Sequence, residues 1–427
     1  MKHRKRLPLV VIAFLAAWCN IPVLNSSPAI EGVPVTITIG ETTPTQAPYV
    51  APTVPAQVCP VPPGSAELPD LGNPPTWAPD ILSYLNAGGL INPLLDHVQA
   101  GYTYDPSAMV GEILDLNNDG FEDLAIVLIQ APSESAPQPT GSMLIFLCSG
   151  ESFQTAYVSP PVSEGGRPAL QTVRDFTGDG RPELLMLWES CGAHTCFAQA
   201  ELLRWDGSGF ENLWLGRSDD LPSPNIEVQE PLSDGSTAIS IRAMGIGSAG
   251  AGPYREIRRT WTWRSESGRF EVLEETLADP YFRIHALHDA DQAALDSDFD
   301  AAIEAYSRVM EDGTLDDWIS GEDGRAALRA YATFRQIVVF SIVDNMEDAE
   351  AGMLFLQAAY PPSSTYHAYA EMAEGFWETF LLSDDIVEAC LSAQNYALNN
   401  PDTVLLPLYY GYANRTYLAV DICPFDR

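Results

Sequence analysis

The 427-residue sequence is poor in basic residues: 22 lysines and arginines face 58 aspartates and glutamates, and the formal net charge is −36. Phosphate binding needs clustered Lys and Arg, so this balance excludes nucleic acid and anionic lipid as partners of the surface. The same charge is compatible with divalent cations, with basic partners or simply with solubility.

Catalytic signatures are also missing. The chain has six histidines and contains neither a Gly-x-Ser-x-Gly elbow nor a His-Glu-x-x-His helix. His285 and His288 share an expected helix face, a spacing that more often reflects packing than ligand binding. Gly245–Gly250 matches a dinucleotide fingerprint in its letters, but Gly252-Pro253 and another strand follow where a helix is required. These absences predict a protein that is not an enzyme.

The apolar run near the N-terminus, Leu9–Trp18, is too short to span a bilayer as a mature helix. It follows the basic stretch Lys2–Arg6, and the pattern predicts a signal peptide over residues 1–18 and an exported protein. Cys19 follows Ala16-Ala17 as in a bacterial lipobox, although a tryptophan replaces the small residue expected directly before the cysteine. Two alternatives stay open: ordinary cleavage, or a lipid on Cys19 as the chain's membrane contact.

If Cys19 is lipidated or removed, six cysteines remain, an even number that suits an oxidising compartment. Cys191-Gly-Ala-His-Thr-Cys196 could hold zinc only with reduced thiols and a fourth ligand, so a disulfide is favoured. Cys191–Cys196 is the expected disulfide and would close one hairpin. Cys390 with Cys423 could join the C-terminus to the fold, which would leave Cys59 with Cys148 by elimination, and the pairing of these four cysteines stays open.

Composition divides the mature chain into four regions. Residues 19–76 are rich in Pro and Thr and predict an extended linker. Residues 77–105 carry leucines at helical spacing and predict a short helical segment broken at Gly88-Gly89. Residues 106–277 predict a β-repeat domain, and residues 278–427 have the texture of an α-helical domain.

The β-repeat region contains three units of four expected strands. A turn of the form Gly-x-x-Phe precedes the fourth strand, shortened in the third unit, and the phenylalanines Phe153, Phe210 and Phe270 lie 57 and 60 residues apart. Regular four-strand units of this length are typical of propeller blades. Three blades are too few to close a ring of the usual size, so we expect a partial β-propeller.

Two acidic loops recur 60 residues apart, between the first and second strands of successive units. Loop 1 is Asp115-Leu-Asn-Asn-Asp-Gly-Phe-Glu-Asp123, and loop 2 is Asp175-Phe-Thr-Gly-Asp-Gly-Arg-Pro-Glu183. Both place oxygen-bearing side chains at positions 1, 3, 5 and 9 and glycine at position 6. Ca²⁺ prefers oxygen ligands from a tightly curled backbone, and glycine permits the sharp turn.

Each loop therefore predicts one structural calcium ion. The expected ligands of the first ion are Asp115, Asn117, Asp119, Asp123 and the carbonyl of Phe121. Those of the second are Asp175, Thr177, Asp179, Glu183 and the carbonyl of Arg181.

Loop 2 is the weaker candidate, because Thr177 is a poorer ligand and Arg181 brings positive charge nearby. An EF-hand would need glutamate at position 12, where the loops have Ile126 and Met186. Turns without metal are the other alternative. A third loop, Glu230–Gly235, lacks an oxygen ligand at position 3, and we expect no ion there.

With these loops and spacings, residues 106–277 resemble FG-GAP/VCBS repeats, which occur in integrin-like β-propellers and many exported bacterial proteins. In the helical region, Ala293–Tyr306 resembles a tetratricopeptide unit. Two weaker matches to this unit follow it in the sequence. Aligning Ala302, Ala349 and Ala389 gives intervals of 47 and 40 residues, longer than the standard repeat of about 34.

The expected fold is therefore multidomain β + α: a partial β-propeller of three four-stranded blades followed by an α-helical, tetratricopeptide-like repeat domain. The expected function is that of an exported, cell-surface-anchored, calcium-stabilised binding protein. Its partner would be an unidentified protein or a cell-envelope or extracellular ligand. The alternative is an extracellular hydrolase whose site is assembled from dispersed blade-loop residues.

Overall fold

The computed structural model describes residues 56–62, 64–101, 109–130, 139–160, 166–319 and 322–425. They belong to the second of two compact units, 1–47 and 48–427. The predicted signal peptide, Cys19 and most of the Pro/Thr-rich linker lie outside the described residues.

The β-repeat region forms three four-stranded antiparallel sheets, in which each strand pairs with its neighbour in sequence. The first sheet contains β1 (Gly111–Leu114), β2 (Asp123–Gln130), β3 (Thr140–Cys148) and β4 (Phe153–Val158). The second contains β5 (Arg167–Arg174), β6 (Glu183–Cys191), β7 (Cys196–Trp205) and β8 (Phe210–Asn212). The third contains β9 (Pro224–Val228), β10 (Ile239–Ala243), β11 (Ile257–Arg264) and β12 (Arg269–Leu277). The predicted grouping into three four-stranded units is confirmed.

The turn before each fourth strand needs glycine for a backbone reason. Gly150, Gly207 and Gly268 adopt φ values of 83°, 102° and 65°. A side chain at such angles is strained, whereas glycine adopts them freely. The Gly-x-x-Phe pattern therefore marks the hairpin between the third and fourth strands, and the phenylalanine that follows packs in the core.

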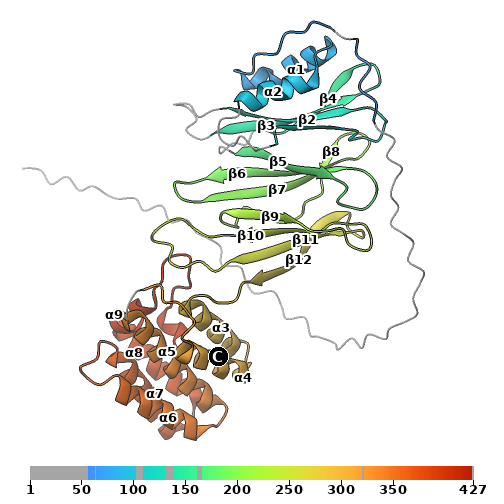
Figure 1. Ribbon diagram of the computed structural model, residues 1–427. Helices are drawn as coiled ribbons and strands as arrows, with labels where there is room; N and C mark the ends of the chain where they lie inside the picture. The colour runs from blue at the N-terminus through green and yellow to red at the C-terminus, as the bar shows by residue number, and fades with distance from the viewer. Residues whose placement is uncertain are drawn as a thin grey trace, which may run out of the picture. The chain divides into compact units, whose positions relative to one another are not determined.

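Two helices cover the outer face of the first sheet: α1 (Trp77–Asn86) and α2 (Ile91–Gly101) (Figure 1). They lie on either side of Gly88-Gly89, as the sequence predicts. Asn86, at the end of α1, donates to the carbonyl of Phe153 at 3.0 Å and accepts from its N–H at 2.8 Å. These reciprocal bonds join the helix to the start of β4 and give hydrogen-bond partners to backbone groups of that edge strand.

The three sheets are stacked face to face in the order of the chain (Figure 1). One core lies between the helices and the first sheet, a second between the first and second sheets, and a third between the second and third sheets. Successive residues of β2 alternate between two cores: Leu124 and Ile126 face the helices, whereas Ala125 and Val127 face the second sheet. Strands buried on both faces read as continuous apolar runs, which is why the sequence signal was strong.

The C-terminal region is helical, with α3 (Arg283–Leu295), α4 (Phe299–Glu311), α5 (Glu322–Ile342), α6 (Met346–Ala359), α7 (His367–Ser383), α8 (Ile386–Asn399) and α9 (Pro401–Val404). Helices α3/α4, α5/α6 and α7/α8 form hairpins with related turns. A left-handed residue (Ser297, Asp344 or Asp384) comes first. An N-cap residue follows, and its side chain accepts a bond from the next helix: Asp298, Asn345 or Asp385.

Ala302, Ala349 and Ala389 occupy equivalent places in the second helix of each hairpin, and all three are fully buried. Only a small side chain allows the paired helices to approach at this point. Each of these alanines lies four residues after the N-cap residue of its helix.

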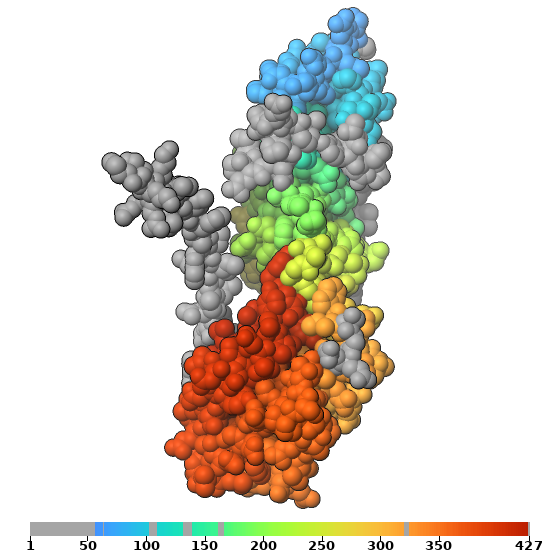
Figure 2. Space-filling view, turned by 90° about the vertical axis from the view of Figure 1, so that its left-hand side faces the viewer, coloured from blue at the N-terminus to red at the C-terminus, as the bar shows by residue number. Residues whose placement is uncertain are grey.

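The connection between β10 and β11 packs against the end of the helical region. The N–H groups of Tyr412 and Ala413 donate to the carbonyls of Gly250 and Ala251 at 3.2 and 3.0 Å. Arg255 forms an ion pair with Asp289 of α3. Figure 2 shows this red C-terminal segment meeting the yellow segment of the third repeat. The glycine-rich stretch that imitates a nucleotide-binding fingerprint is thus a loop, as predicted, and its glycines permit close backbone contact.

Three disulfides join Cys59 to Cys148, Cys191 to Cys196, as expected, and Cys390 to Cys423. Among the described residues, no helix combines the length and apolar composition that a membrane span requires.

Candidate metal sites

Loops 1 and 2 occupy the same place in successive sheets. Each leaves the first strand of its sheet and ends on the first residue of the second strand, Asp123 of β2 or Glu183 of β6. The position-6 glycines, Gly120 and Gly180, adopt φ values of 92° and 84°. These values confirm the sharp turn expected from the sequence.

In loop 1, the position-1 carboxylate organises the backbone. Asp115 accepts from the N–H of Asp119 at 3.1 Å and from that of Gly120 at 2.8 Å. Asn117 donates to Asp119 at 2.9 Å. Asp119 in turn accepts from the N–H of Phe121 at 2.9 Å. The three side chains at positions 1, 3 and 5 therefore lie close together. Both oxygens of Asp115 accept from backbone N–H groups, whereas those of Asp119 accept from one backbone N–H and from the amide of Asn117.

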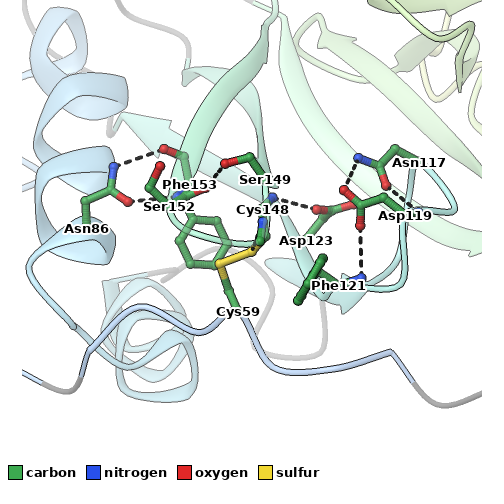
Figure 3. The surroundings of a disulfide bond; sticks show 11 residues. Cys59, Asn86, Asn117, Asp119, Phe121, Asp123, Cys148, Ser149, Ser152 and Phe153 are labelled. Atoms are coloured by element: carbon green, nitrogen blue, oxygen red, sulfur yellow. Dashed lines mark hydrogen bonds between the residues drawn. A yellow bond between two sulfur atoms is a disulfide. The ribbon is translucent and has the colours of Figure 1, made fainter.

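Asp123, at position 9, is fully buried. One of its oxygens accepts the N–H of Leu116 at 2.8 Å. The other accepts the N–H of Cys148, also at 2.8 Å (Figure 3). Asp123 therefore joins the start of the loop to the end of β3. This bridging arrangement is a role that the loop pattern alone does not show.

In loop 2, Asp175 accepts from the N–H groups of Gly178 and Gly180 at 2.7 and 2.8 Å. Glu183, the first residue of β6, accepts the N–H of Phe176 at 2.7 Å and the hydroxyl of Thr177 at 3.0 Å. It therefore joins the start of loop 2 to β6, whereas Asp123 also reaches the end of β3. Thr177 thus donates its proton toward Glu183 and can still offer a lone pair to a cation.

The carboxylates converge in loop 2. One oxygen from each of Asp175, Asp179 and Glu183 lies within 4.8 Å of the other two. In the described part of the chain, no other three His, Cys, Asp or Glu side chains come together in this way. The sequence ranks loop 1 as the better site, whereas carboxylate convergence favours loop 2. The reason is geometric: ligand identity can be counted from the pattern, but the side-chain directions cannot.

An arginine already neutralises part of loop 2. Arg181 donates to Asp179 from Nη2 at 2.8 Å and from Nε at 3.2 Å. Arg204 lies 3.8 Å from the same carboxylate. A calcium ion in loop 2 would compete with these guanidinium groups for Asp179.

The pKa values of Asp123 and Glu183, the position-9 acids, are shifted far from their ordinary values. Burial, together with the charge of the other two carboxylates of each loop, raises the pKa of Asp123 and of Glu183 to about 7. Backbone N–H donors act in the opposite direction. A divalent cation beside these groups would favour their charged forms and lower both pKa values.

The other sequence candidates are explained by packing. His285 is buried on α3, with Nε2 3.3 Å from the carbonyl of Pro253. His288 is held between aromatic neighbours, with its ring 6.1 Å from that of Tyr417. The cysteines on either side of His194 form a disulfide and are not available as thiolate ligands.

Sequence reasoning missed a pocket of about 420 Å³ in the helical region. It lies between α4 and α6, with α5 contributing the third wall, and we call it the α4–α6 pocket. Its lining side chains are mostly apolar or uncharged: Ile303, Ser307, Met310, Thr333, Gln336, Ile337, Phe340, Ala351, Gly352 and Phe355, with Glu311, Arg329 and Asp348 as its charged members.

Comparison with known proteins finds no match: no family model fits the chain, and no curated protein or solved structure is similar to it. The resemblance of loops 1 and 2 to FG-GAP/VCBS calcium loops therefore stays a prediction from their residues.

Proposed function

We propose that this chain is an exported, calcium-stabilised binding protein, attached to the cell surface by its N-terminal segment, and that it has no catalytic role. Its stacked sheets would be blades of a partial, FG-GAP/VCBS-like propeller, and its helical hairpins a tetratricopeptide-like binding domain. The α4–α6 pocket is the observation that carries the binding function.

The calcium ions would stabilise the sheets and would take no part in a reaction. In each loop a cation would offset three carboxylates whose mutual repulsion opposes the curled backbone. Because Asp123 and Glu183 bridge the loop to the sheet, the ion would also stabilise the junction between the first two strands. Any ligand that binds only the folded form raises the free energy of unfolding.

The α4–α6 pocket has the character of a protein-binding surface. Phe340, Ile337 and Met310 supply an apolar lining, and Phe355 on the rim remains 45% exposed. Arg329 forms no ion pair within the described residues, although the chain is strongly acidic. A partner segment with an apolar anchor beside a carboxylate would match these features.

The hydroxyl groups of the pocket do not favour the hydrolase alternative. Ser307 donates to the carbonyl of Ile303 at 2.9 Å and accepts from Gln336 at 2.7 Å. Thr333 donates to the carbonyl of Arg329 at 2.8 Å. Among the described residues, neither hydroxyl is hydrogen-bonded to a histidine or a carboxylate that could accept its proton, as nucleophilic catalysis requires.

The proposal can be tested with two matched substitutions on α6. Phe355 lines the pocket, whereas its neighbour Leu354 is 59% exposed and does not. A photo-crosslinking residue at position 355 would first capture partners from the native cell envelope, and the affinity of the purified partner would then be measured. We expect Phe355→Glu to weaken binding at least tenfold, since it places a charge in an apolar contact. Leu354→Glu adds the same charge and should leave binding unchanged.

Equal affinity of both variants for the captured partner would show that the pocket is not the binding surface.

A further inference from the structure

Loop 1 has a feature that loop 2 lacks: a short segment from the N-terminal side of the fold is paired with it. We call residues Ala56–Cys59 the strap. Gln57 and Phe121 form an isolated parallel bridge. The N–H of Gln57 donates to the carbonyl of Gly120 at 2.8 Å, and the N–H of Glu122 donates to the carbonyl of Gln57 at 2.8 Å.

These two bonds determine which way the position-7 carbonyl points. In a trans peptide, the N–H and C=O groups point in opposite directions. The N–H of Glu122 points to the strap, so the carbonyl of Phe121, in the same peptide unit, points away from it. The preceding unit is consistent with this geometry: its carbonyl, on Gly120, faces the strap, and its N–H, on Phe121, donates to Asp119 at 2.9 Å.

A disulfide also joins the strap to the surroundings of Asp123, the expected ligand at position 9. Cys59 forms a disulfide with Cys148, and the N–H of Cys148 donates to Asp123 at 2.8 Å. Figure 3 shows the disulfide beside Phe121 and Asp123. Cys59 is 8% exposed and Cys148 is fully buried, so a reductant reaches this bridge only when the strap moves.

Loop 2 provides an internal comparison. The isolated bridges within the described ranges join Gln57–Phe121, Met109–Leu170, Trp214–Phe270 and Phe282–Asp316, and none of them involves residues 175–183. Arg181, which stands where Phe121 does in loop 1, is instead paired with Asp179.

We propose that the strap is a positioning element of the loop 1 calcium site, and that calcium in loop 1 in turn holds the strap in place. This proposal rests on the calcium binding proposed above. If strap docking strengthens calcium binding, thermodynamic linkage requires calcium to strengthen strap docking by the same factor. The strap lies inside the segment predicted as a linker, residues 19–76, so calcium would secure the point where this segment joins the folded region.

The first test uses the full-length protein carrying Asp175→Ala, so that calcium acts on loop 1 and not on the sheet that carries Cys191–Cys196. Its disulfides are exposed to a mild thiol reductant with calcium or with chelator, and reduced cysteines are alkylated and counted by mass spectrometry over time. Calcium should slow reduction of Cys59–Cys148 at least fivefold and leave Cys191–Cys196 unaffected, because the latter is far from loop 1 in the chain and closes its own hairpin. Equal calcium effects on both bridges would overturn the proposal.

The second test compares prolines at neighbouring positions in a protein carrying Asp175→Ala, so that loop 1 alone binds calcium. Gln57→Pro removes the N–H that donates to Gly120, whereas Val58→Pro removes an N–H for which the structure shows no acceptor. We expect Gln57→Pro to weaken calcium binding about five- to tenfold, the usual effect of one lost hydrogen bond. Val58→Pro should match the parent.

The outcomes separate the two levels of inference. If the Asp175→Ala parent binds no calcium although the wild type does, the calcium site proposed for loop 1 fails, and this proposal fails with it. If the parent binds calcium and both proline variants bind it equally well, only the role of the strap is overturned.

Discussion

Arg181 makes a quantitative prediction about loop 2. Its guanidinium donates to Asp179 in the ligand position 5, and both side chains are partly exposed, at 42% and 32%. Arg181→Gln removes the positive charge while keeping a polar side chain. Calcium then has one guanidinium group fewer to displace, because Arg204 remains 3.8 Å from Asp179.

Two contributions set the size of the effect. A partly exposed ion pair is worth roughly 0.5 kcal/mol. Repulsion between an arginine and Ca²⁺ about 5 Å apart adds roughly 1–2 kcal/mol at the dielectric constant of water. Their sum of roughly 1.5–2.5 kcal/mol corresponds to a gain in calcium affinity of about 10- to 70-fold. Without calcium the sign is opposite, because the loss of the ion pair leaves the loop carboxylates less compensated and lowers stability by about 0.5 kcal/mol.

Isothermal titration calorimetry in an Asp115→Ala background would measure loop 2 alone. Arg181→Lys retains the charge and should stay close to the parent. Arg217→Gln is a matched control, because Arg217 forms an ion pair with Asp219 two residues away and outside the loop. An unchanged or lower affinity of Arg181→Gln would refute the competition between arginine and calcium.

Two further predictions concern the helical core. Burial lowers the pKa of His288 to about 4. The folded protein therefore protonates this histidine at a lower pH than the unfolded chain does, and the free energy of unfolding should fall as the pH drops from about 6.5 to 4. Urea unfolding at pH 7.5 and 5 should show a steeper loss for the parent than for His288→Gln, by up to about 2 kcal/mol; parallel losses would refute this. Asp291 accepts the hydroxyls of Tyr306 and Tyr417 at 2.6 Å and pairs with the buried Arg335 at 3.2 Å. Asp291→Asn should therefore cost about 3–5 kcal/mol by leaving Arg335 uncompensated, well above Tyr417→Phe at about 1 kcal/mol, and equal costs in urea unfolding would contradict this reasoning.

Much of the fold could be predicted because its signals are local. The strands of the sheets are apolar runs bounded by turns, and the positive φ of Gly150 explains why the Gly-x-x-Phe pattern recurs. The helical hairpins were visible through small residues such as Ala349, which must be small where two helices meet. Each of these constraints acts within one or two elements, so the sequence carries it directly.

The candidate site was predicted only in part. The acidic pattern located loops 1 and 2, but it assigned Asp123 as a ligand without showing that the end of β3 returns to donate to it. The pairing of Gln57 with Phe121 joins segments 64 residues apart and leaves no periodic signal. The α4–α6 pocket likewise depends on how helices pack, which the residue pattern of a single helix does not specify.

Equilibrium dialysis of the full-length protein against radioactive calcium tests the central claim most directly. The wild type should bind two ions per chain at saturation, the Asp115→Ala and Asp175→Ala variants one each, and the double variant none. Absence of calcium uptake by the wild type, or uptake that the double substitution leaves unchanged, would contradict the account.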